Sequence, residues 1–526
     1  MKLGQHEEDE PSGGGIDGPK KYANQWRFGE ITKALAQHLP NIGQLNLVYD
    51  YFWCRHDRPL AYATQFHALI GFAIDPDQMR LVSFWVKGGM EQRLLPYALQ
   101  DIPRYTSYPT AAQFGPLAAS EFEDWRAQLP ADSTLSAYVH VPFCRQLCWY
   151  CGCHTSIPND YARVTRFVEA ICAEIKQAGA SLAQKGHVKH VHFGGGTPTF
   201  LKPHDFTFIM EALRENLGLM EGAELAVEID PRTLTPALIS TLILNGINRV
   251  SLGVQDFSLS VQAKINRIQP YGLVAHGVES LRKAGIDAIN FDLIYGLPGQ
   301  TLESVSESAR LTAQLAPSRV AVFGYAHVPW FKKQQQMIRE ADLPGVEARF
   351  QQAMRIGEIL QEEGYIAIGL DHYVRADDAM AKAHAGHELR RNFQGYTTDA
   401  ADGLLGFGPS SISAMPQGFA QNTRDQAQWL SKVEAGQCSV DRGLAVTQED
   451  QRRAAIISEI MCYLKADISD FPDALPRLET LAADGLVEIS GSEIRVPEAM
   501  RLFCRTVAQA FDAHYVPSEK RHAKAV

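Results

Sequence analysis

Short runs of β-branched and other apolar residues alternate with longer helical patterns between residues 136 and 323. Six runs are predicted to be strands: Ala137–Val141, His190–Phe193, Glu224–Ile229, Arg249–Val254, Ala288–Ile294 and Arg319–Phe323. Strands that alternate with helices are typical of βα units around a parallel sheet. The pattern therefore predicts an α/β fold with a partial (β/α)6 barrel. Ligands of such folds bind at the C-terminal ends of the strands, so we expect the chemistry just past each run.

The pattern changes after the predicted barrel, whose segment we place at residues 90–345. One helix is predicted at Val346–Glu363, among Gly-rich loops, and we expect residues 346–440 to close the barrel rather than to build it. A Thr-x-x-Asp start at Thr447 predicts a capped amphipathic helix through Leu464, and strands are predicted at Leu486–Ile489 and Glu493–Val496. Residues 441–526 are thus predicted to form a helical, winged-helix-like domain. Because it lacks a basic recognition surface, docking is favoured over DNA binding.

Residues 1–89 show no periodic apolar pattern, and a helix is plausible there only around Ala34–His38. The pattern of apolar and polar residues changes at Met90. The preceding Lys87-Gly88-Gly89 could be encoded by a purine-rich ribosome-binding stretch. We therefore interpret residues 1–89 as an N-terminal extension and hypothesise that Met90 is the true initiator.

Composition and charge exclude several classes of protein. Of the 526 residues 45% are apolar and 21% charged, which does not fit a disordered or fibrous chain. The net charge of −10 disfavours nucleic acid as a partner. The most apolar stretch, Phe66–Val86, is interrupted by charged residues, and the acidic, Gly-rich start does not read as a signal peptide. We expect a cytoplasmic protein without a membrane partner, acting as a monomer.

The strongest chemical signal is a group of four cysteines that directly follows the first predicted strand. The group consists of Cys144, Cys148, Cys151 and Cys153, whereas the other five cysteines are scattered. Three thiolates spaced C-x3-C-x2-C can hold three irons of a [4Fe–4S] cluster and leave the fourth open, and an open position on a metal centre is typical of catalysis. Structural zinc remains the alternative. It would have to recruit His140, His154 or Cys153, because no second cysteine pair lies at suitable spacing.

A glycine-rich turn, Gly194-Gly195-Gly196-Thr197-Pro198-Thr199, follows the second predicted strand. Glycines at a strand end let the backbone approach a ligand closely and present its N–H groups. The turn lies one βα unit after the cysteine loop. We interpret it as part of the same binding site.

The cysteine loop resembles that of the radical S-adenosylmethionine enzymes. The resemblance implies one [4Fe–4S] cluster held by Cys144, Cys148 and Cys151. In this family the amino and carboxylate groups of S-adenosylmethionine chelate the open iron, and an electron from the cluster breaks the sulfonium to give a 5′-deoxyadenosyl radical. The resemblance also implies that no side chain acts as a catalyst beyond this radical.

Longer stretches resemble one branch of this family, which converts coproporphyrinogen III to protoporphyrinogen IX in heme biosynthesis without oxygen. They are Pro103–Thr110, Tyr138–His140, Gly194–Thr199, Val227–Arg232, Gly253–Phe257, Asp292–Pro298, Tyr325–Pro329 and Arg391–Thr398. The resemblance implies two bound S-adenosylmethionine molecules. Contacts to the cluster-bound molecule are carried over to Tyr138, Tyr150, Gly195, Glu228 and Ile412. Contacts to the second are carried over to Gly196, Thr197, Gln255, Arg267, Asp292 and Ala326, with Gln394 nearby.

The implied substrate, coproporphyrinogen III, carries four propionates, two of which become vinyl groups after loss of a β-hydrogen, carbon dioxide and an electron. Such an anion requires basic side chains, and Arg104, Arg390 and Arg391 are the candidates. An electron donor and an electron acceptor are also implied, both unidentified. A heme-binding or heme-trafficking homologue of the same fold is the alternative. Cys153, which such homologues commonly lack, favours the enzyme and is not expected to bind the cluster.

Overall fold

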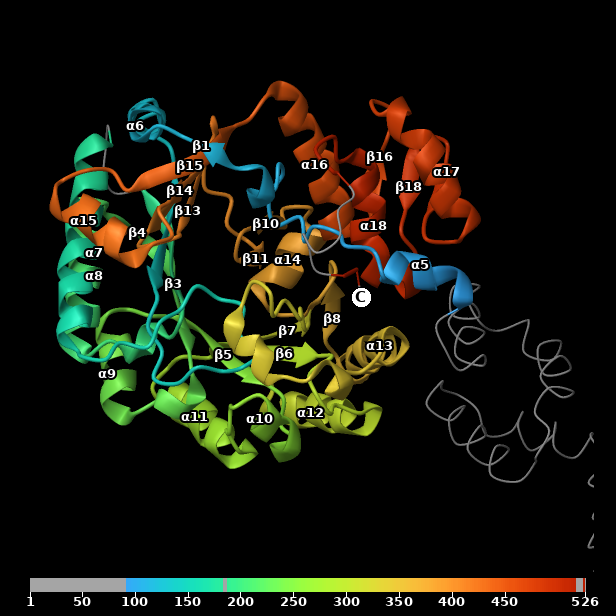
Figure 1. Cartoon of the computed structure of the whole chain (residues 1–526), viewed down its shortest axis with the longest axis horizontal. Helices are drawn as coiled ribbons and strands as arrows, with labels where there is room; N and C mark the ends of the chain where they lie inside the picture. Colours follow the sequence, from blue (N-terminus) through green and yellow to red (C-terminus); the bar gives the residue numbers. More distant parts are fainter. Residues whose placement is uncertain (1–90, 183–186, 517–523, 526) are drawn as a thin grey trace, which may run out of the picture. The chain divides into compact units, whose positions relative to one another are not determined.

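The computed structural model describes residues 91–182, 187–516 and 524–525 (Figure 1). The predictions for residues 1–89 and for Met90 lie outside these residues. Over the described part, none of the helices has both the length and the apolar composition that crossing a membrane requires.

Six adjacent parallel strands form the centre of the molecule. They are β2 (Leu135–Val141), β3 (Val188–Gly195), β4 (Leu219–Ile229), β5 (Arg249–Gln255), β6 (Ala288–Tyr295) and β7 (Arg319–Gly324). They lie in chain order, each paired in parallel with the next. All six predicted strands are confirmed. The apolar runs form strands because each then buries its side chains on at least one face of the sheet.

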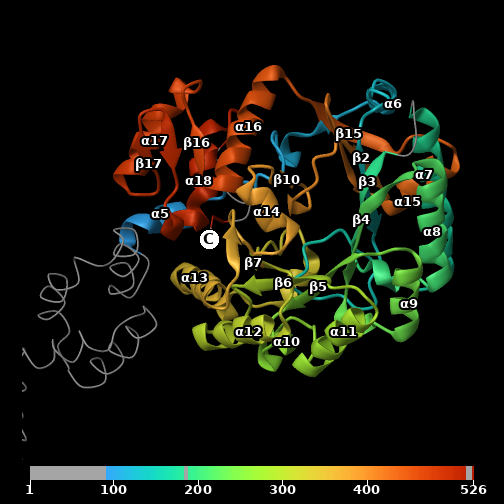
Figure 2. The same ribbon diagram turned by 180° about the vertical axis from the view of Figure 1, so that it is seen from behind.

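Helices follow the outside of this curved sheet (Figures 1 and 2). They are α7 (Ala162–Ser181), α8 (Pro203–Asn216), α9 (Pro236–Leu244), α10 (Leu259–Lys264), α11 (Tyr271–Lys283), α12 (Leu302–Leu315) and α13 (Val346–Glu362). Local chemistry sets several of their starts. Thr235 caps α9 with its side chain, and Thr301 and Ser304 form a capping box on α12. Helices outside and parallel strands inside give the predicted partial barrel.

The prediction that residues 346–440 close the barrel without building it is wrong. β12 (Gly403–Phe407) pairs in parallel with β2, and β13 (Ile412–Met415), β14 (Gly418–Asn422), β15 (Val440–Ala445) and β1 (Gly115–Pro116) continue the sheet antiparallel. On the other side β9 (His372–Val374) and β8 (Ile366–Ile368) follow β7, which gives a sheet of 13 strands. These strands escaped the sequence analysis because they are short and interrupted by glycine or polar residues. Within the same region α14 (Ala379–Ala385), α15 (Gln426–Glu434) and the hairpin of β10 (Arg390–Asn392) and β11 (Gly395–Thr397) lie outside this sheet.

The C-terminal segment has the order helix, strand, helix and hairpin. α16 (Gln448–Tyr463) starts at the predicted capping box of Thr447 and Asp450 and ends at Tyr463, with Leu464 as its C-cap. β16 (Lys465–Asp467), α17 (Leu475–Ala483), β17 (Glu488–Ser490) and β18 (Glu493–Arg495) follow, and the three strands pair in the order β16-β18-β17. α18 (Cys504–Ala508) comes after them. Near the other end of the described chain lie α5 (Leu95–Ala98) and α6 (Ala119–Ala127).

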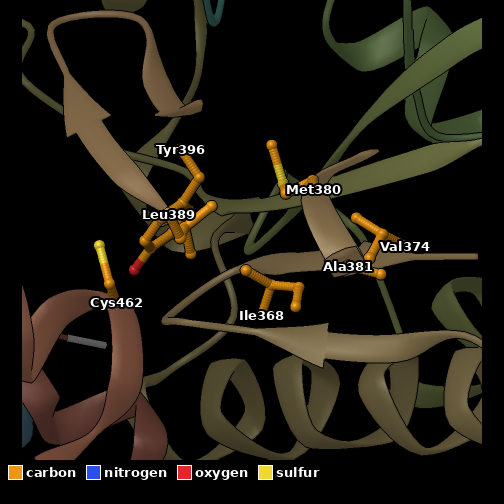
Figure 3. Close-up of a cluster of buried hydrophobic side chains, with 7 residues drawn as sticks. All are labelled: Ile368, Val374, Met380, Ala381, Leu389, Tyr396 and Cys462. Carbon is orange, nitrogen blue, oxygen red and sulfur yellow. The ribbon is translucent and has the colours of Figure 1, made fainter. Parts of the chain in front are cut away.

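A buried apolar cluster joins the last strands of the large sheet to α16 (Figure 3). It consists of Ile368, Val374, Met380, Ala381, Leu389, Tyr396 and Cys462. The Tyr396 hydroxyl also donates a hydrogen bond to the carbonyl of Met461 at 2.6 Å and accepts one from the N–H of Leu370 at 2.8 Å. These bonds satisfy a buried phenol and fix the hairpin of β10 and β11 against the C-terminal domain.

Candidate active site

The cysteine loop leaves the C-terminal end of β2 and is tied to the turn that follows α10. The Trp149 N–H donates to the carbonyl of Ile265 at 3.0 Å. The Asn266 amide donates to the carbonyl of Leu147 at 2.9 Å and accepts from Gln146 at 2.8 Å. Loop backbone groups need such partners because no sheet or helix supplies them. The loop is therefore held in one conformation beside β5.

A second set of contacts comes from the segment after β7. Gln335 donates to the carbonyl of Tyr150 at 2.8 Å, Gln334 to that of Cys151 at 2.7 Å, and Lys332 to that of Cys153 at 2.9 Å. Gln335 is buried and also donates to the carbonyl of Ala326 at 3.2 Å. Sequence reasoning missed these residues, because a Lys- and Gln-rich run carries no signal of burial.

Each of the three predicted cluster cysteines has a hydrogen-bond donor beside its sulfur. Thr197 lies 3.7 Å from the sulfur of Cys144, Arg267 3.5 Å from that of Cys148, and the N–H of Cys153 3.4 Å from that of Cys151. Burial raises the pKa of Cys144 to about 11, whereas the side-chain hydrogen bond with Cys153 outweighs burial and lowers the pKa of Cys151 to about 7. Donors of this kind stabilise thiolates, the form in which cysteine binds metals.

The donor set fits an iron–sulfur cluster better than a zinc ion. Within the described residues no group of three or more His, Cys, Asp or Glu side chains is placed to hold a single metal ion. Three thiolates from one loop can instead each bind a separate iron of a cluster. The exposed Cys153 lies next to these thiols: its N–H donates to the sulfur of Cys151, and its thiol forms a hydrogen bond with that neighbour.

The glycines at the end of β3 are required by close packing of the protein itself. A Cβ atom at Gly194 would lie 2.7 Å from a carboxylate oxygen of Glu228, and one at Gly195 would lie 2.7 Å from the ring of His140. At Gly196 it would lie 2.7 Å from the carbonyl of Phe143, in the cysteine loop. Gly195 also has a φ of +110°, which side chains disfavour. The predicted turn thus brings β3, β4 and the cysteine loop together.

Polar side chains cross the face of β2, β3 and β4 next to this turn. Nε2 of His192 lies 3.1 Å from Oε1 of Glu228, and the ring of Tyr138 stacks on that of His192 with 5.9 Å between the centroids. On β6, burial and the charge of Glu228 raise the pKa of Asp292 to about 7. Sequence reasoning missed His192. The strand period of two would have placed it on the same face as Gly194.

His140 has a defined tautomer. Its Nε2 lies 2.9 Å from the carbonyl of His154, which can only accept, so Nε2 carries the hydrogen. Nδ1 then accepts from the hydroxyl of Tyr138 at 3.2 Å. Burial lowers the pKa of His140 to about 4, so the ring is neutral at physiological pH.

Arg267 is buried between the cysteine loop and β5. Its guanidinium donates to Asp230 at 3.2 Å and to the carbonyl of Gly253 at 2.7 Å, and its Nε has no partner among the described residues. Burial raises the pKa of Asp230, but the hydrogen bond from Arg232 and the charge of Arg267 outweigh burial and lower it. Sequence analysis assigned Arg267 to the second S-adenosylmethionine molecule. In the structure it already pairs with Asp230, a residue to which that analysis gave no role.

The remaining predicted ligand residues lie at strand ends with two exceptions. Gln255 ends β5 with a φ of 68° and a buried Oε1 that has no partner among the described residues. Ala326 follows β7, and Ile412 begins β13. Tyr150 packs from the cysteine loop against an apolar cluster around Tyr325. Gln394 is exposed in the hairpin of β10 and β11, and no contact among the described residues joins it to the others.

The three predicted substrate arginines differ in what they can still bind. Arg391 donates to the carbonyls of Tyr105 at 3.1 Å and Arg104 at 3.2 Å, and its guanidinium lies 4.4 Å from the ring centroid of Tyr396. It therefore holds the N-terminal segment in place. Arg390 is exposed and lines a surface cavity of about 580 Å³ beside α14. Arg104 is exposed beside the end of β7.

Comparisons with known proteins agree with this geometry. Residues 138–312 match the Radical SAM superfamily. A protein of Bradyrhizobium diazoefficiens named oxygen-independent coproporphyrinogen III oxidase is 46% identical over 442 residues, which cover 82% of this chain and 98% of the relative. A protein of Paracoccus denitrificans with the same name is 38% identical and covers 78% of this chain and 94% of its own. The solved structure of coproporphyrinogen III oxidase from Escherichia coli, described as a radical SAM enzyme, is 34% identical with a TM-score of 0.75, and the match covers 79% of this chain and all of that structure.

Proposed function

The chain belongs to the family of oxygen-independent coproporphyrinogen III oxidases within the radical SAM superfamily, and we propose that it converts coproporphyrinogen III to protoporphyrinogen IX. Two propionate side chains become vinyl groups, each with loss of carbon dioxide, one hydrogen atom and one electron. This is an oxidative decarboxylation in heme biosynthesis. The observation that carries the proposal is the loop of three donor-flanked thiols at the C-terminal end of β2, in a chain that spans nearly the full length of its relatives.

The family implies a [4Fe–4S] cluster and S-adenosylmethionine. When bound, they supply one-electron chemistry that can remove a hydrogen atom from an unactivated carbon. Cys144, Cys148 and Cys151 hold the cluster. Arg267 and Arg232, at 3.5 and 3.6 Å from the sulfur of Cys148, offset the negative charge that three thiolates bring into a buried loop.

Two S-adenosylmethionine molecules bind at the ends of the strands. Tyr138, Tyr150, Gly195, Glu228 and Ile412 contact the cluster-bound molecule. Gly196, Thr197, Gln255, Arg267, Asp292 and Ala326 contact the second, with Gln394 nearby. The unpaired Oε1 of Gln255 and Nε of Arg267 support this arrangement, because buried polar atoms are normally satisfied and a ligand would supply their partners.

Side chains of the barrel set the protonation of the site. Asp292, with a pKa of about 7, carries a proton on part of the molecules at neutral pH and can then donate a hydrogen bond to a ligand. Glu228 is already engaged by His192 and by the N–H of Gly195 at 3.3 Å. The carboxylates of β4 and β6 thus offer both an acceptor and a proton-bearing group.

The test is an anaerobic assay with reconstituted cluster, reductant, S-adenosylmethionine and coproporphyrinogen III. Vinyl products formed together with 5′-deoxyadenosine support the proposal, and Cys148→Ser serves as the control without activity. Stoichiometric heme binding without vinyl products would contradict it and favour the heme-carrying alternative.

A further inference from the structure

Several positive charges surround Tyr295 at the end of β6. Burial and the carboxylate of Asp371 raise the pKa of its phenol, whereas the charges of Arg349, Arg505 and Arg104 lower it. Arg104 acts in turn on both Arg349 and Arg505, so three guanidiniums lie near one another in a partly buried region of an otherwise acidic chain. Grouping like charges away from water is unfavourable unless an anion neutralises them.

Two of the other arginines in this region already have partners. Arg505 donates to the carbonyl of Ile102 at 3.1 Å and to that of Ala525 at 2.6 Å, and burial and Arg104 lower its pKa to about 10. Arg391 is held by carbonyls of the N-terminal segment. These two guanidiniums fix the chain around the site, and each keeps only one buried nitrogen, Nε of Arg505 and Nη1 of Arg391, without a partner among the described residues.

Arg349 differs from them because its side chain makes neither a hydrogen bond nor an ion pair within the described residues, and its buried Nε has no partner there. Its guanidinium lies between two glycines. A Cβ atom at Gly296 would lie 3.0 Å from Nη1, and one at Gly324 would lie 3.3 Å from Nη2. The ring of Tyr295 lies 5.9 Å away. The backbone thus leaves room for the guanidinium without supplying a partner.

The place of Arg349 in its helix is also unfavourable for stability. It is the fourth residue of α13, in the first turn, where the helix dipole is positive and acidic side chains are preferred. A cation there raises the positive potential of the helix start. Such a placement is understandable where an anion binds, since a helix start and an arginine both attract carboxylates.

Contacts link this position to the candidate active site. Arg104 donates to the carbonyl of Gly324 at 3.4 Å, so two guanidiniums meet at the end of β7. Two residues further on, Ala326 is joined through Gln335 to the cysteine loop. Tyr325 interacts electrostatically with Arg349, and it packs in one apolar cluster with Trp149 and Tyr150 of that loop.

We infer that Arg349, with Arg104 beside it, is the carboxylate anchor of the active site and binds a propionate of the porphyrinogen substrate. This inference rests on the proposed function, because it takes the substrate from there. The chemistry it names is a carboxylate. Both a propionate and the methionyl part of S-adenosylmethionine could supply one, and the experiment separates these two sources.

The test compares the wild type with Arg349→Gln and Arg349→Lys in the reconstituted full chain. Arg355→Gln is the matched control, since Arg355 lies on the same helix and pairs with Glu358 at 3.0 Å. Binding of coproporphyrin III, the fluorescent oxidised form with the same four propionates, is measured by fluorescence. Binding of S-adenosylmethionine and the kcat and KM for coproporphyrinogen III are measured in parallel.

We expect Arg349→Gln to weaken porphyrin binding and raise KM on the order of 10- to 100-fold, as loss of a hydrogen bond to a charged group does. Arg349→Lys should recover part of the loss, and S-adenosylmethionine binding should stay within about twofold. Unchanged porphyrin binding, or a loss confined to S-adenosylmethionine, would overturn the inference.

The two failures can be told apart. If wild-type protein forms no vinyl product but binds the porphyrin in an Arg349-dependent way, the proposed function falls and the anchor stands. If wild-type protein turns over and Arg349→Gln does not alter KM, the anchor falls and the function stands.

Discussion

The guanidinium of Arg267 lies 3.5 Å from the thiol sulfur of Cys148. Arg267 is buried, and the charges of Tyr150, Asp230 and Cys148 outweigh its burial and raise its pKa, so it is a permanent cation at the cysteine loop. A fixed cation with an N–H directed at a ligating sulfur stabilises electron density there. Arg267, which is predicted to contact the second S-adenosylmethionine molecule, is therefore also expected to affect the reduction potential of the cluster.

Arg267→Gln should make the cluster harder to reduce. Removal of the charge and of its hydrogen bond is expected to lower the reduction potential on the order of 50 to 100 mV for a one-electron couple. An anaerobic redox titration followed by electron paramagnetic resonance measures this. Arg310→Gln, an exposed arginine on α12, is the control. A potential unchanged in Arg267→Gln would show that this contact does not act on the cluster.

The four cysteines of the loop should divide into two groups. Cys144→Ser, Cys148→Ser and Cys151→Ser should each lose most of the bound iron, because each removes one of three thiolate ligands. Cys153→Ser should keep iron and sulfide near wild-type amounts but lower turnover, because we do not expect the Cys153 thiol to be a ligand, whereas its hydrogen bond with Cys151 lowers the pKa of that thiol. Iron and sulfide analysis of anaerobically purified protein decides. Loss of the cluster in Cys153→Ser would make it a ligand.

The sequence predicts the parts of the fold that repeat a strong pattern. The six strands from β2 to β7 are apolar runs that alternate with helical patterns, and the start of α16 is set by the local hydrogen bonds of Thr447 and Asp450. β8, β9 and β12 to β15 have three to six residues and are held by long-range pairing with the large sheet. Pairing between segments that are distant in the sequence cannot be predicted from local sequence patterns.

The candidate site shows the same division. The cysteines and glycines could be identified because their spacing is unusual. The strand period gives the face on which His192 lies, but the roles of His192, Asp230 and Gln335 could not be predicted, since each arises only when another strand or loop comes within hydrogen-bond distance. Arg349 is the extreme case, because what distinguishes it is the missing partner of a buried guanidinium.

Asp292 should make stability depend on pH. Burial and Glu228 raise its pKa from 3.8 to about 7, so the folded state holds a proton that the unfolded state releases. Its contribution is therefore fully present below pH 4 and is lost as the pH rises towards 7. Asp292→Asn should be more stable than the wild type, and this difference in the free energy of unfolding should be larger at pH 8 than at pH 5, reaching on the order of a few kcal/mol. Thermal melting at both pH values tests this, with the exposed Asp377→Asn as control. A gain independent of pH would contradict the assignment.

Gly195 and Gly152 form a matched pair for the packing of the glycine turn. A Cβ atom at Gly195 would lie 2.7 Å from the ring of His140, and the backbone there has a φ of +110°, whereas at Gly152, inside the cysteine loop, a Cβ atom would meet nothing within 4 Å. Gly195→Ala should therefore cost about 1 to 3 kcal/mol from backbone strain alone, before the clash is counted.

We expect Gly195→Ala to lower the melting temperature and the content of bound iron, because the added Cβ atom displaces the ring of His140, which is hydrogen-bonded to the carbonyl of His154 beside the cysteine loop. Gly152→Ala should leave both unchanged. Melting curves and iron analysis of the two variants, purified side by side without oxygen, provide the comparison. Equal behaviour of the two variants would mean that the turn tolerates a side chain and that its glycines are not required by packing.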